Sequence, residues 1–291
     1  MRRTRTARLA LLGLTTALAL SACGSDDEGG SAAPAPEQTT FEAGTTMAAI
    51  QERGTIRIGV KYDQPLFGER QLSGDVEGLD VEMGKIIAAK LGLAEDDIEF
   101  VEAVSRNREP FLQQGQVDLV IATYTINDTR KEVVDFAGPY YITGQSLLVA
   151  ADDDSIGGKE DLAGKTVCSV TGSTPLERIK TEAPQATVIE FDTYGRCAQA
   201  VLNDQADAVT TDEAILLGLL LGAEEDFKVV GEQFSEEPYG IGLKKGDQAF
   251  RDFLNDTIEA SYEDGSYQEA LEATVGQVQD ELPEGPPVDR Y

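Results

Sequence analysis

Apolar residues along most of the chain fall into short β-rich runs that alternate with segments of helical periodicity. Residues 55–60 (TIRIGV) and 117–122 (VDLVIA) are β-rich, and the second run is almost wholly apolar. Such a run is typical of a strand in a parallel sheet that is covered on both faces. A helix that Asp80 caps is predicted after the first strand. Its apolar side chains recur at helical spacing: Met83, Ile86, Ile87 and Leu91.

The same alternation continues to the end of the chain and starts afresh near residue 145. Strands are predicted at 55–60, 98–101, 117–122, 145–150, 166–170, 187–191, 206–210, 227–230 and 239–243. Helices are predicted at 81–91, 108–114, 131–134, 194–203, 212–221, 248–263 and 267–274. This order predicts an α/β fold of two lobes with largely parallel sheets. A ligand is then expected between the lobes, outside the carboxyl ends of strands.

The first residues have the pattern of an export signal rather than of a folded element. Four arginines precede an apolar stretch over residues 9–20, which is too short for a comfortable membrane span. The stretch ends in Leu-Ser-Ala-Cys at residues 20–23. This resembles the lipobox of bacterial lipoproteins and implies a signal peptide over residues 1–22 and a lipid on Cys23. The alternative is an ordinary secretory signal with a chance cysteine. Residues 23–47 are rich in Gly, Ser, Ala, Pro and acid, so we predict a flexible tether.

Charge and cysteine content narrow the class of protein. The chain has 53 acidic and 24 basic residues, no histidine and a formal charge of −29. Loss of residues 1–22, with four arginines and no acid, would leave −33, which argues against a nucleic-acid partner. If Cys23 carries lipid, Cys168 and Cys197 remain, and we predict a disulfide between them; two buried free thiols are the alternative. No Cys/His cluster is present, so neither a metal nor another cofactor is expected.

One short segment combines groups that suit an anion. Thr123 and Thr125 alternate at a predicted strand end, and Arg130 follows in the first turn of a short helix. A guanidinium grips a carboxylate bidentately, and a helix start adds a partial positive charge. The alternative is a solvated arginine that pairs with Asp128 or Glu132.

The whole body of the chain resembles the polar amino-acid class of solute-binding proteins that serve ABC importers. Six stretches carry the resemblance, in order: GTIRIGVKYDQPLFG, GLDVEMGKIIAAKLG, VDLVIATYTINDTRKEVVDFAGPYY, DLAGKTVCSVTGST, ADAVTTDEAIL and YGIGLKKGD. The resemblance implies the type II periplasmic-binding-protein fold, with two lobes joined by two crossing strands. It implies one lobe from residues 48–144 plus 239–291, and a second lobe from residues 145–238.

The resemblance also implies how a free amino acid would be held. Thr125 and Arg130 occupy the positions that bind the α-carboxylate, with Ala122 and Thr123 lining the pocket. Asp212 occupies the position that accepts from the α-ammonium, although it is also placed to cap a helix. Ser173 and Thr174, at a helix start, are expected to offer backbone N–H groups, and plain N-capping is their alternative.

Three further positions point to an acidic ligand. Lys61 and Arg108 align with residues that hold the distal carboxylate in binders of acidic amino acids, and Tyr194 falls where some relatives have histidine. Lysine at position 61 departs from the arginine of some relatives, which keeps the charge but not the bidentate geometry. The alternatives are a surface lysine for Lys61 and an exposed helix arginine for Arg108.

These observations predict a receptor rather than an enzyme. The chain has no GxSxG motif and no histidine for a catalytic triad. We expect a monomeric protein, lipid-anchored at the extracellular face of the cell membrane, that captures an acidic amino acid by lobe closure and delivers it to an ABC permease and its ATPase. The alternatives are a binder of glutamine, asparagine or another polar amino acid, a ligand sensor, or a dehydratase-like enzyme on the same fold.

Overall fold

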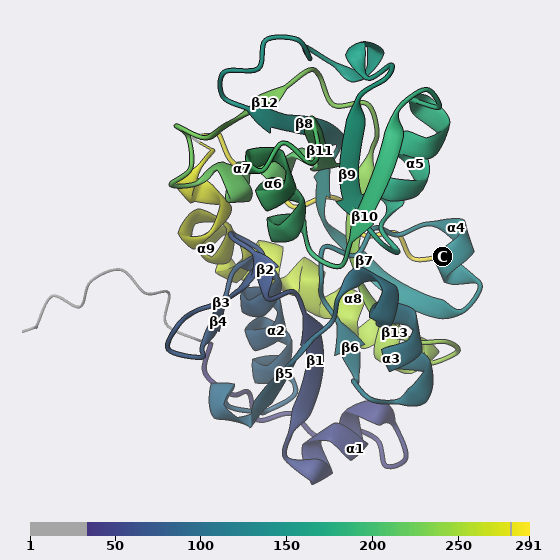
Figure 1. Ribbon diagram of the computed structural model, residues 1–291. Coiled ribbons are helices and arrows are strands. Elements are labelled where there is room, and N and C mark those ends of the chain that lie inside the picture. Colours follow the sequence, from purple (N-terminus) through teal and green to yellow (C-terminus); the bar gives the residue numbers. More distant parts are fainter. Residues whose placement is uncertain (1–33, 280) are drawn as a thin grey trace, which may run out of the picture. The chain divides into compact units, whose positions relative to one another are not determined.

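The computed structural model describes residues 34–279 and 281–291. The predicted signal peptide, Cys23 and the first part of the predicted tether lie outside these residues. The described chain forms two lobes, each built on a five-stranded sheet that carries helices on its faces (Figure 1). The α/β class and the restart of the pattern near residue 145 are therefore confirmed.

The first sheet has the strand order β5-β1-β6-β13-β7. Its strands are β1 (Ile56–Val60), β5 (Ile98–Glu102), β6 (Leu119–Val120), β7 (Val134–Thr143) and β13 (Glu237–Lys244). Strand β1 is parallel to β5 and β6, whereas β13 is antiparallel to both of its neighbours. A small antiparallel sheet adjoins this lobe, formed by β2 (Asp63–Gln64), β3 (Gly68–Arg70) and β4 (Val76–Glu77).

The second sheet has the strand order β10-β9-β11-β8-β12. Its strands are β8 (Gln145–Ala150), β9 (Thr166–Val170), β10 (Thr187–Phe191), β11 (Ala208–Asp212) and β12 (Phe227–Val230). Strand β9 is parallel to β10 and β11, and β8 is antiparallel to β11 and β12. Both sheets are thus mixed: the parallel half matches the βαβ order of the sequence, but the prediction of largely parallel sheets was wrong, because half of the strand pairings in each sheet are antiparallel.

Two long strands carry the chain between the sheets. Strands β7 and β13 pair with each other over their length, from Val134 with Lys244 to Thr143 with Glu237. The chain leaves the first sheet after β7, begins β8 in the second sheet at Gln145, and returns through β13. These are the two crossing strands that the family resemblance implied. The exact lobe limits at residues 144/145 and 238/239 stay a prediction.

Helices cover both faces of each sheet, which explains the apolar strands. The first lobe carries α1 (Thr46–Arg53), α2 (Leu79–Lys90), α3 (Arg108–Gln114), α4 (Asp128–Lys131), α8 (Gln248–Asp264) and α9 (Ser266–Ala273). The second carries α5 (Thr174–Glu182), α6 (Tyr194–Leu202) and α7 (Glu213–Leu220). Successive side chains of a strand enter opposite core layers. In β8, for example, Leu148 packs in one layer and Leu147 and Val149 in the other.

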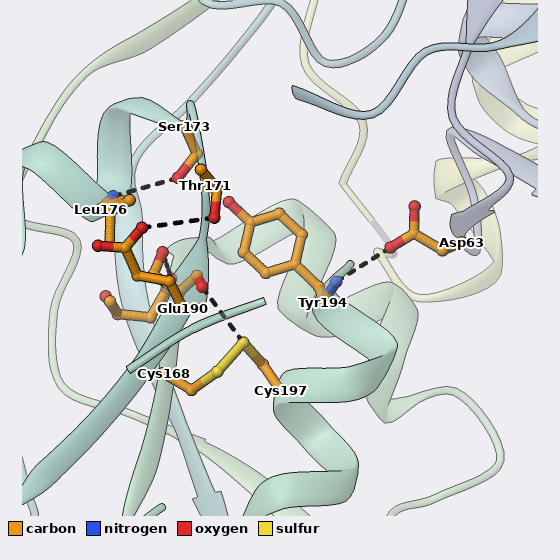
Figure 2. The surroundings of a disulfide bond; sticks show 10 residues. Asp63, Cys168, Thr171, Ser173, Leu176, Glu190, Tyr194 and Cys197 are labelled. Atoms are coloured by element: carbon orange, nitrogen blue, oxygen red, sulfur yellow. Dashed lines mark hydrogen bonds between the residues drawn. A yellow bond between two sulfur atoms is a disulfide. The ribbon is translucent and has the colours of Figure 1, made fainter. Parts of the chain in front are cut away.

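The predicted disulfide is confirmed. Cys168 and Cys197 are bonded, with their Cα atoms 5.4 Å apart, and the bond ties β9 to α6 (Figure 2). Both residues are buried. On the chain-entropy model, a closed loop of this length stabilises the fold by about 3–4 kcal/mol.

Several local predictions were wrong. Asp80 does not cap α2: it lies inside the helix, fully buried, and accepts hydrogen bonds from Tyr140 and the backbone of Thr123. The helix predicted to continue through Val134 ends at Lys131, because Val134 already pairs in β7. Helix α1 and the small three-stranded sheet were not predicted, since their elements are short and none of them has more apolar than polar residues.

Candidate functional site

A small cavity of about 10 Å³ lies where the two lobes meet. The first lobe contributes Ser105, Arg108, Thr123 and Thr125, and the second contributes Ser173, Thr174, Pro175, Tyr194, Asp212 and Ile215. Seven of the ten predicted binding residues line this cavity, so sequence segments about 100 residues apart converge as expected. Lys61, Ala122 and Arg130 are buried beside it instead of in its wall.

Arg108 is held rigidly in the first lobe. It starts α3, is 2% exposed, and donates from Nε to the Ser105 carbonyl at 3.2 Å. Its Nη1 donates to the carbonyls of Ala122 and Thr123 at 3.0 and 3.2 Å. The guanidinium also lies over the Tyr124 ring, 4.3 Å from the centroid. The alternative of an exposed helix arginine is therefore wrong, and so many fixed donors leave the group little freedom to move.

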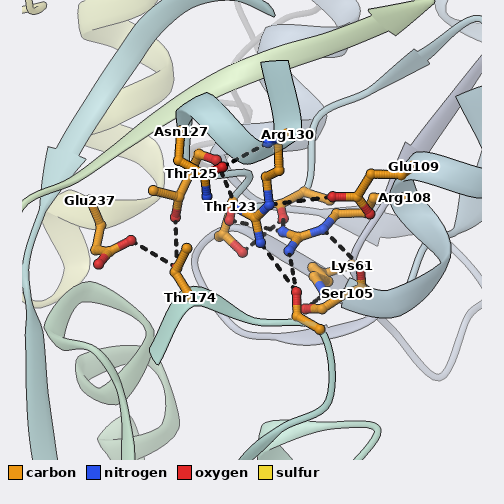
Figure 3. Close-up of polar contacts among 12 residues, drawn as sticks. Lys61, Ser105, Arg108, Glu109, Thr123, Thr125, Asn127, Arg130, Thr174 and Glu237 are labelled. Carbon is orange, nitrogen blue, oxygen red and sulfur yellow. Dashed lines mark hydrogen bonds and ion pairs between the residues drawn. The ribbon is translucent and has the colours of Figure 1, made fainter. Parts of the chain in front are cut away.

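Lys61 is a buried cation with few partners. Only 2% of it is exposed, so it is not a surface lysine. Its Nζ donates to the Ser105 hydroxyl at 2.8 Å (Figure 3), and it forms no ion pair within residues 34–279 and 281–291. Burial, and next the charge of Arg108, lower the pKa of Lys61 to about 7, although Asp63 and Asp80 partly offset this. An anion placed beside Lys61 and Arg108 would stabilise the charged form of Lys61 and offset its repulsion from Arg108.

Arg130 occupies the short helix α4, which Asn127 caps through its side chain. Its Nη1 donates to the Thr125 carbonyl at 2.7 Å, its Nη2 to the Gly172 carbonyl of the second lobe at 3.2 Å, and its Nε pairs with Glu109 at 3.3 Å (Figure 3). Burial and the charge of Arg108 lower its pKa to about 10, so it remains a cation near neutral pH. The alternative of a solvated arginine paired with Asp128 or Glu132 is wrong.

Gly172 brings the second lobe against both arginines. Its carbonyl accepts from Arg130 and, at 3.4 Å, from Arg108. Its φ is +82°, and a Cβ at this position would lie 2.8 Å from the backbone of Arg106. Glycine is therefore required here by conformation and by close approach of the two lobes. The ion pair of Arg106 with Asp192 also joins the lobes.

Asp212 is a buried carboxylate, and one of its oxygens has no partner in the part of the chain that the structure describes. It occupies the N-cap position of α7, yet its side chain makes no capping bond, so the predicted capping alternative is wrong. Its Oδ2 accepts from the Tyr239 hydroxyl at 2.6 Å, whereas Oδ1 is buried without a partner among the described residues. Burial, and next the charge of Glu237, raise the pKa of Asp212 to about 7. An unpaired buried acceptor is costly, and a cationic donor from a ligand would satisfy it.

The threonines of the first lobe are fixed by their neighbours. Thr123 has φ +43°, and its backbone N–H donates to Asp80 at 2.9 Å while its hydroxyl donates to Gln64 at 2.9 Å. Thr125 pairs in an isolated bridge with Tyr239 of β13. Its Oγ1 lies 3.2 Å from Oγ1 of Thr174, which links the two lobes directly.

Second-lobe residues enter the cavity from two helix starts. Ser173 caps α5 by accepting from Leu176 at 3.1 Å, so its N-capping alternative is correct (Figure 2). Tyr194 opens α6, and its backbone N–H donates across the lobes to Asp63 at 3.0 Å. Burial raises the pKa of the Tyr194 phenol well above its usual range, so it stays protonated and able to donate.

Besides Pro175 and Ile215 in the cavity wall, four residues that bond to side chains or backbone around the cavity were missed from the sequence. Ser105 accepts a hydrogen bond from Lys61, and Glu237 accepts one from Thr174. Tyr239 donates to Asp212, and Asp63 accepts from the backbone N–H of Tyr194. Only Ser105 carried a sequence signal, since it lies three residues before Arg108 in the same polar segment. The others contact residues distant in sequence.

Comparison with known proteins places the chain in a family. The profile of "Bacterial extracellular solute-binding proteins, family 3" matches residues 56–277. The glutamate-binding protein GluB of Corynebacterium glutamicum is 40% identical over 99% of this chain and 97% of its own length. The glutamine-binding protein GlnH of Bacillus subtilis, named as an ABC transporter protein, is 38% identical over 90% of this chain and 93% of its own.

Solved structures agree with this. An ancestral arginine-binding protein bound to glutamine is 37% identical, with a TM-score of 0.73 over 77% of this chain and 99% of that protein. Family profile, relatives and fold therefore agree, and the chain belongs to the family 3 bacterial extracellular solute-binding proteins.

Proposed function

We propose that this protein is the extracytoplasmic receptor of an ABC importer and that it captures an acidic amino acid, glutamate first, by closure of its two lobes. The observation that carries the proposal is the charge arrangement at the cavity. Asp212 has a buried carboxylate oxygen that no group in residues 34–279 or 281–291 pairs with, and Lys61 and Arg108 are buried basic residues. A zwitterion with a second carboxylate complements both, because each of its charges must be paired when it leaves water.

The groups of the ligand would then have distinct partners. The α-ammonium donates to Oδ1 of Asp212, the atom that has no partner among the described residues. The α-carboxylate is held by Arg130, with backbone N–H groups of Thr125 and Thr174 nearby. The distal carboxylate meets Lys61 and Arg108, with Ser105 and the Tyr194 phenol as neutral donors.

Glutamine is the second candidate, because relatives of both names match the chain to similar extents. Lys61 favours glutamate. An amide oxygen accepts a hydrogen bond from an ammonium but does not compensate its buried charge. Lys61 therefore discriminates in favour of the acid.

The test of this preference is Lys61→Met, which removes the charge and keeps an unbranched chain of similar length. We expect affinity for L-glutamate to fall about 30-fold or more, since a ligand carboxylate would lose a charged partner. Affinity for L-glutamine should change little or rise. Lys61 is preferable to Arg108 for this purpose, because Arg108 also satisfies three backbone carbonyls of its own lobe.

Titration calorimetry with both ligands measures the two affinities. Lys228→Met is the matched control, since Lys228 pairs at the surface with Asp154. An equal loss of glutamate and glutamine binding in Lys61→Met would show that the distal carboxylate is not held there.

The pH profile gives an independent check. The pKa of Lys61 is lowered to about 7, and a ligand carboxylate would raise it. The contribution of Lys61 to glutamate affinity is therefore full below pH 7 and falls as pH rises above it. The pKa of Asp212 is raised to about 7, and a ligand ammonium would lower it, so the contribution of Asp212 is full above pH 7 and falls as pH drops below it. Glutamate affinity should therefore peak near neutral pH, with limbs of up to about tenfold per pH unit.

The pH profile of glutamine affinity should show only the acidic limb, which distinguishes the titration of Asp212 from that of Lys61. The ammonium of glutamine needs ionised Asp212, so the acidic limb should remain, whereas the alkaline limb should disappear because no second carboxylate meets Lys61. Calorimetry of both ligands across this range checks the profile. An alkaline limb of the same size for glutamine would contradict the assignment of Lys61. Burial also raises the pKa of Asp80 to about 7, and this carboxyl accepts from Tyr140 and from the backbone of Thr123.

The cellular setting is also part of the proposal. The family is one of extracellular solute-binding proteins, and the relatives are named as amino-acid-binding proteins, which supports an exported receptor that delivers its ligand to a permease. Within the described residues, every helix is too short or too polar to cross a membrane. We propose anchoring through a lipid on Cys23 and a monomeric state, and mass spectrometry of the mature N-terminus would reject the anchor by finding Cys23 unmodified. Neighbouring permease and ATPase genes would distinguish import from sensing.

A further inference from the structure

Glu237 is a fully buried carboxylate in the crossing strand β13, outside the wall of the cavity. It lies where β13 pairs with β7, opposite Thr143. Its Oε2 accepts from the Thr174 hydroxyl at 2.8 Å, and its Oε1 accepts from Arg178 at 2.8 Å and Ser235 at 2.9 Å. Thr174 and Arg178 are four residues apart in α5, so this carboxylate fastens the first turn of that helix to the crossing strand.

The charge of Glu237 sets the direction of the hydrogen bonds that join the lobes. An ionised carboxylate only accepts, so the single hydroxyl proton of Thr174 points to Glu237. The oxygen of Thr174 must then accept from the hydroxyl of Thr125, 3.2 Å away (Figure 3). The result is a directed chain from Thr125 of the first lobe through Thr174 of the second to Glu237 in the crossing strand.

The hydrogen-bond chain connects Glu237 to the predicted ligand site, although Glu237 itself does not line that site. The carbonyl of Thr125 accepts from Arg130 at 2.7 Å, so Thr125 stands between the arginine and the chain. Thr174 is the first residue of α5, and its backbone N–H is one of the predicted ligand donors. A shift of either residue would change the distance between the donors that face the ligand from opposite lobes.

We propose that Glu237 is a positioning residue for ligand binding: through the Thr125–Thr174–Glu237 chain it aligns the two lobes in the closed state. The inference rests on the proposed function, because its effect is measured as ligand affinity. Charged hydrogen bonds of this kind strengthen their neighbours in a buried network. The chain needs both lobes together, so it stabilises the closed form and its loss should speed ligand release.

Two substitutions break the chain at different points. Thr174→Val removes the hydroxyl and keeps the backbone N–H, and Glu237→Gln removes the charge with little change of shape. We expect each to weaken L-glutamate and L-glutamine alike, by about tenfold, through a faster dissociation rate. The double variant should lose no more ligand affinity than the single variant that binds less tightly, because one break already interrupts the hydrogen-bond chain. Thr174→Ser, which keeps the hydroxyl, should retain most of the affinity that Thr174→Val loses.

Stopped-flow and calorimetric titration of the full chain supply these values, with Thr181→Val as control. Thr181 lies two turns further along α5 and bonds only to a carbonyl of its own helix among the described residues. Additive losses of about a hundredfold in the double variant would indicate two separate structural effects and overturn the proposal. Affinity within about twofold of wild type in Thr174→Val would overturn it too, even if Glu237→Gln failed to fold. A wild-type protein that binds neither ligand would instead refute the proposed function on which the inference rests.

Discussion

Arg130→Ala is expected to weaken L-glutamate and L-glutamine to the same extent, by about a hundredfold or more. Both ligands share the α-carboxylate that Arg130 is proposed to hold, so their ratio of affinities should not change. Arg130 is 7% exposed, and its guanidinium already donates to the carbonyls of Thr125 and Gly172. Without it, a ligand carboxylate would enter a buried site with no bidentate partner.

Two further variants make the Arg130 result specific. Arg130→Lys keeps the charge without the planar fork and should recover only part of the affinity. Arg290→Ala removes an exposed arginine that pairs with Asp256 and Glu259, and calorimetry should find wild-type affinity. If Arg130→Ala spared glutamine and weakened glutamate alone, Arg130 would belong to the distal end of the ligand and the proposed orientation would be reversed.

Asp212→Asn is the second change with a large expected effect. It keeps the size of the side chain and an acceptor for Tyr239 but removes the charge that would pair with the α-ammonium. We expect affinity for both amino acids to fall about a hundredfold or more. Glutarate, which has both carboxylates and no ammonium, should not be weakened by this change.

The stability of the ligand-free protein should move in the opposite direction. Asp212 is buried, its Oδ1 has no partner among the described residues, and its pKa is raised by burial, so the charged form is disfavoured in the empty site. Asp212→Asn should therefore leave the unfolding temperature unchanged or raise it. Loss of binding together with a clearly lower unfolding temperature would mean that Asp212 serves the fold rather than the ligand.

The convergence of the site was predictable because the carboxyl end of a strand in each of the two sheets is expected to face the region between the lobes. Thr125 and Arg130 follow β6, Asp212 ends β11, and these ends face the same cavity region. The burial of Lys61 and Arg108 is harder to predict, since the sequence around each reads equally as a solvated surface. Family resemblance decided those two positions, and the exposed fractions agree with it.

The supporting residues escaped prediction because their partners are remote. Glu237 contacts Thr174 and Arg178 at separations of 63 and 59 residues, and Asp63 contacts Tyr194 at a separation of 131. Local patterns carry no information about such pairs. Asp80 shows the converse error: it has the local signature of a helix cap, but burial beside Tyr140 gives its carboxylate a tertiary partner instead.

Titration of the wild-type protein with L-glutamate, L-glutamine and glutarate at neutral pH decides whether the cavity between the lobes holds a zwitterion. We expect saturable binding of L-glutamate, weaker binding of L-glutamine and much weaker binding of glutarate. Equal affinity for glutarate and L-glutamate, or no binding of either amino acid, would contradict a site built to hold a zwitterion between Asp212 and the buried cations.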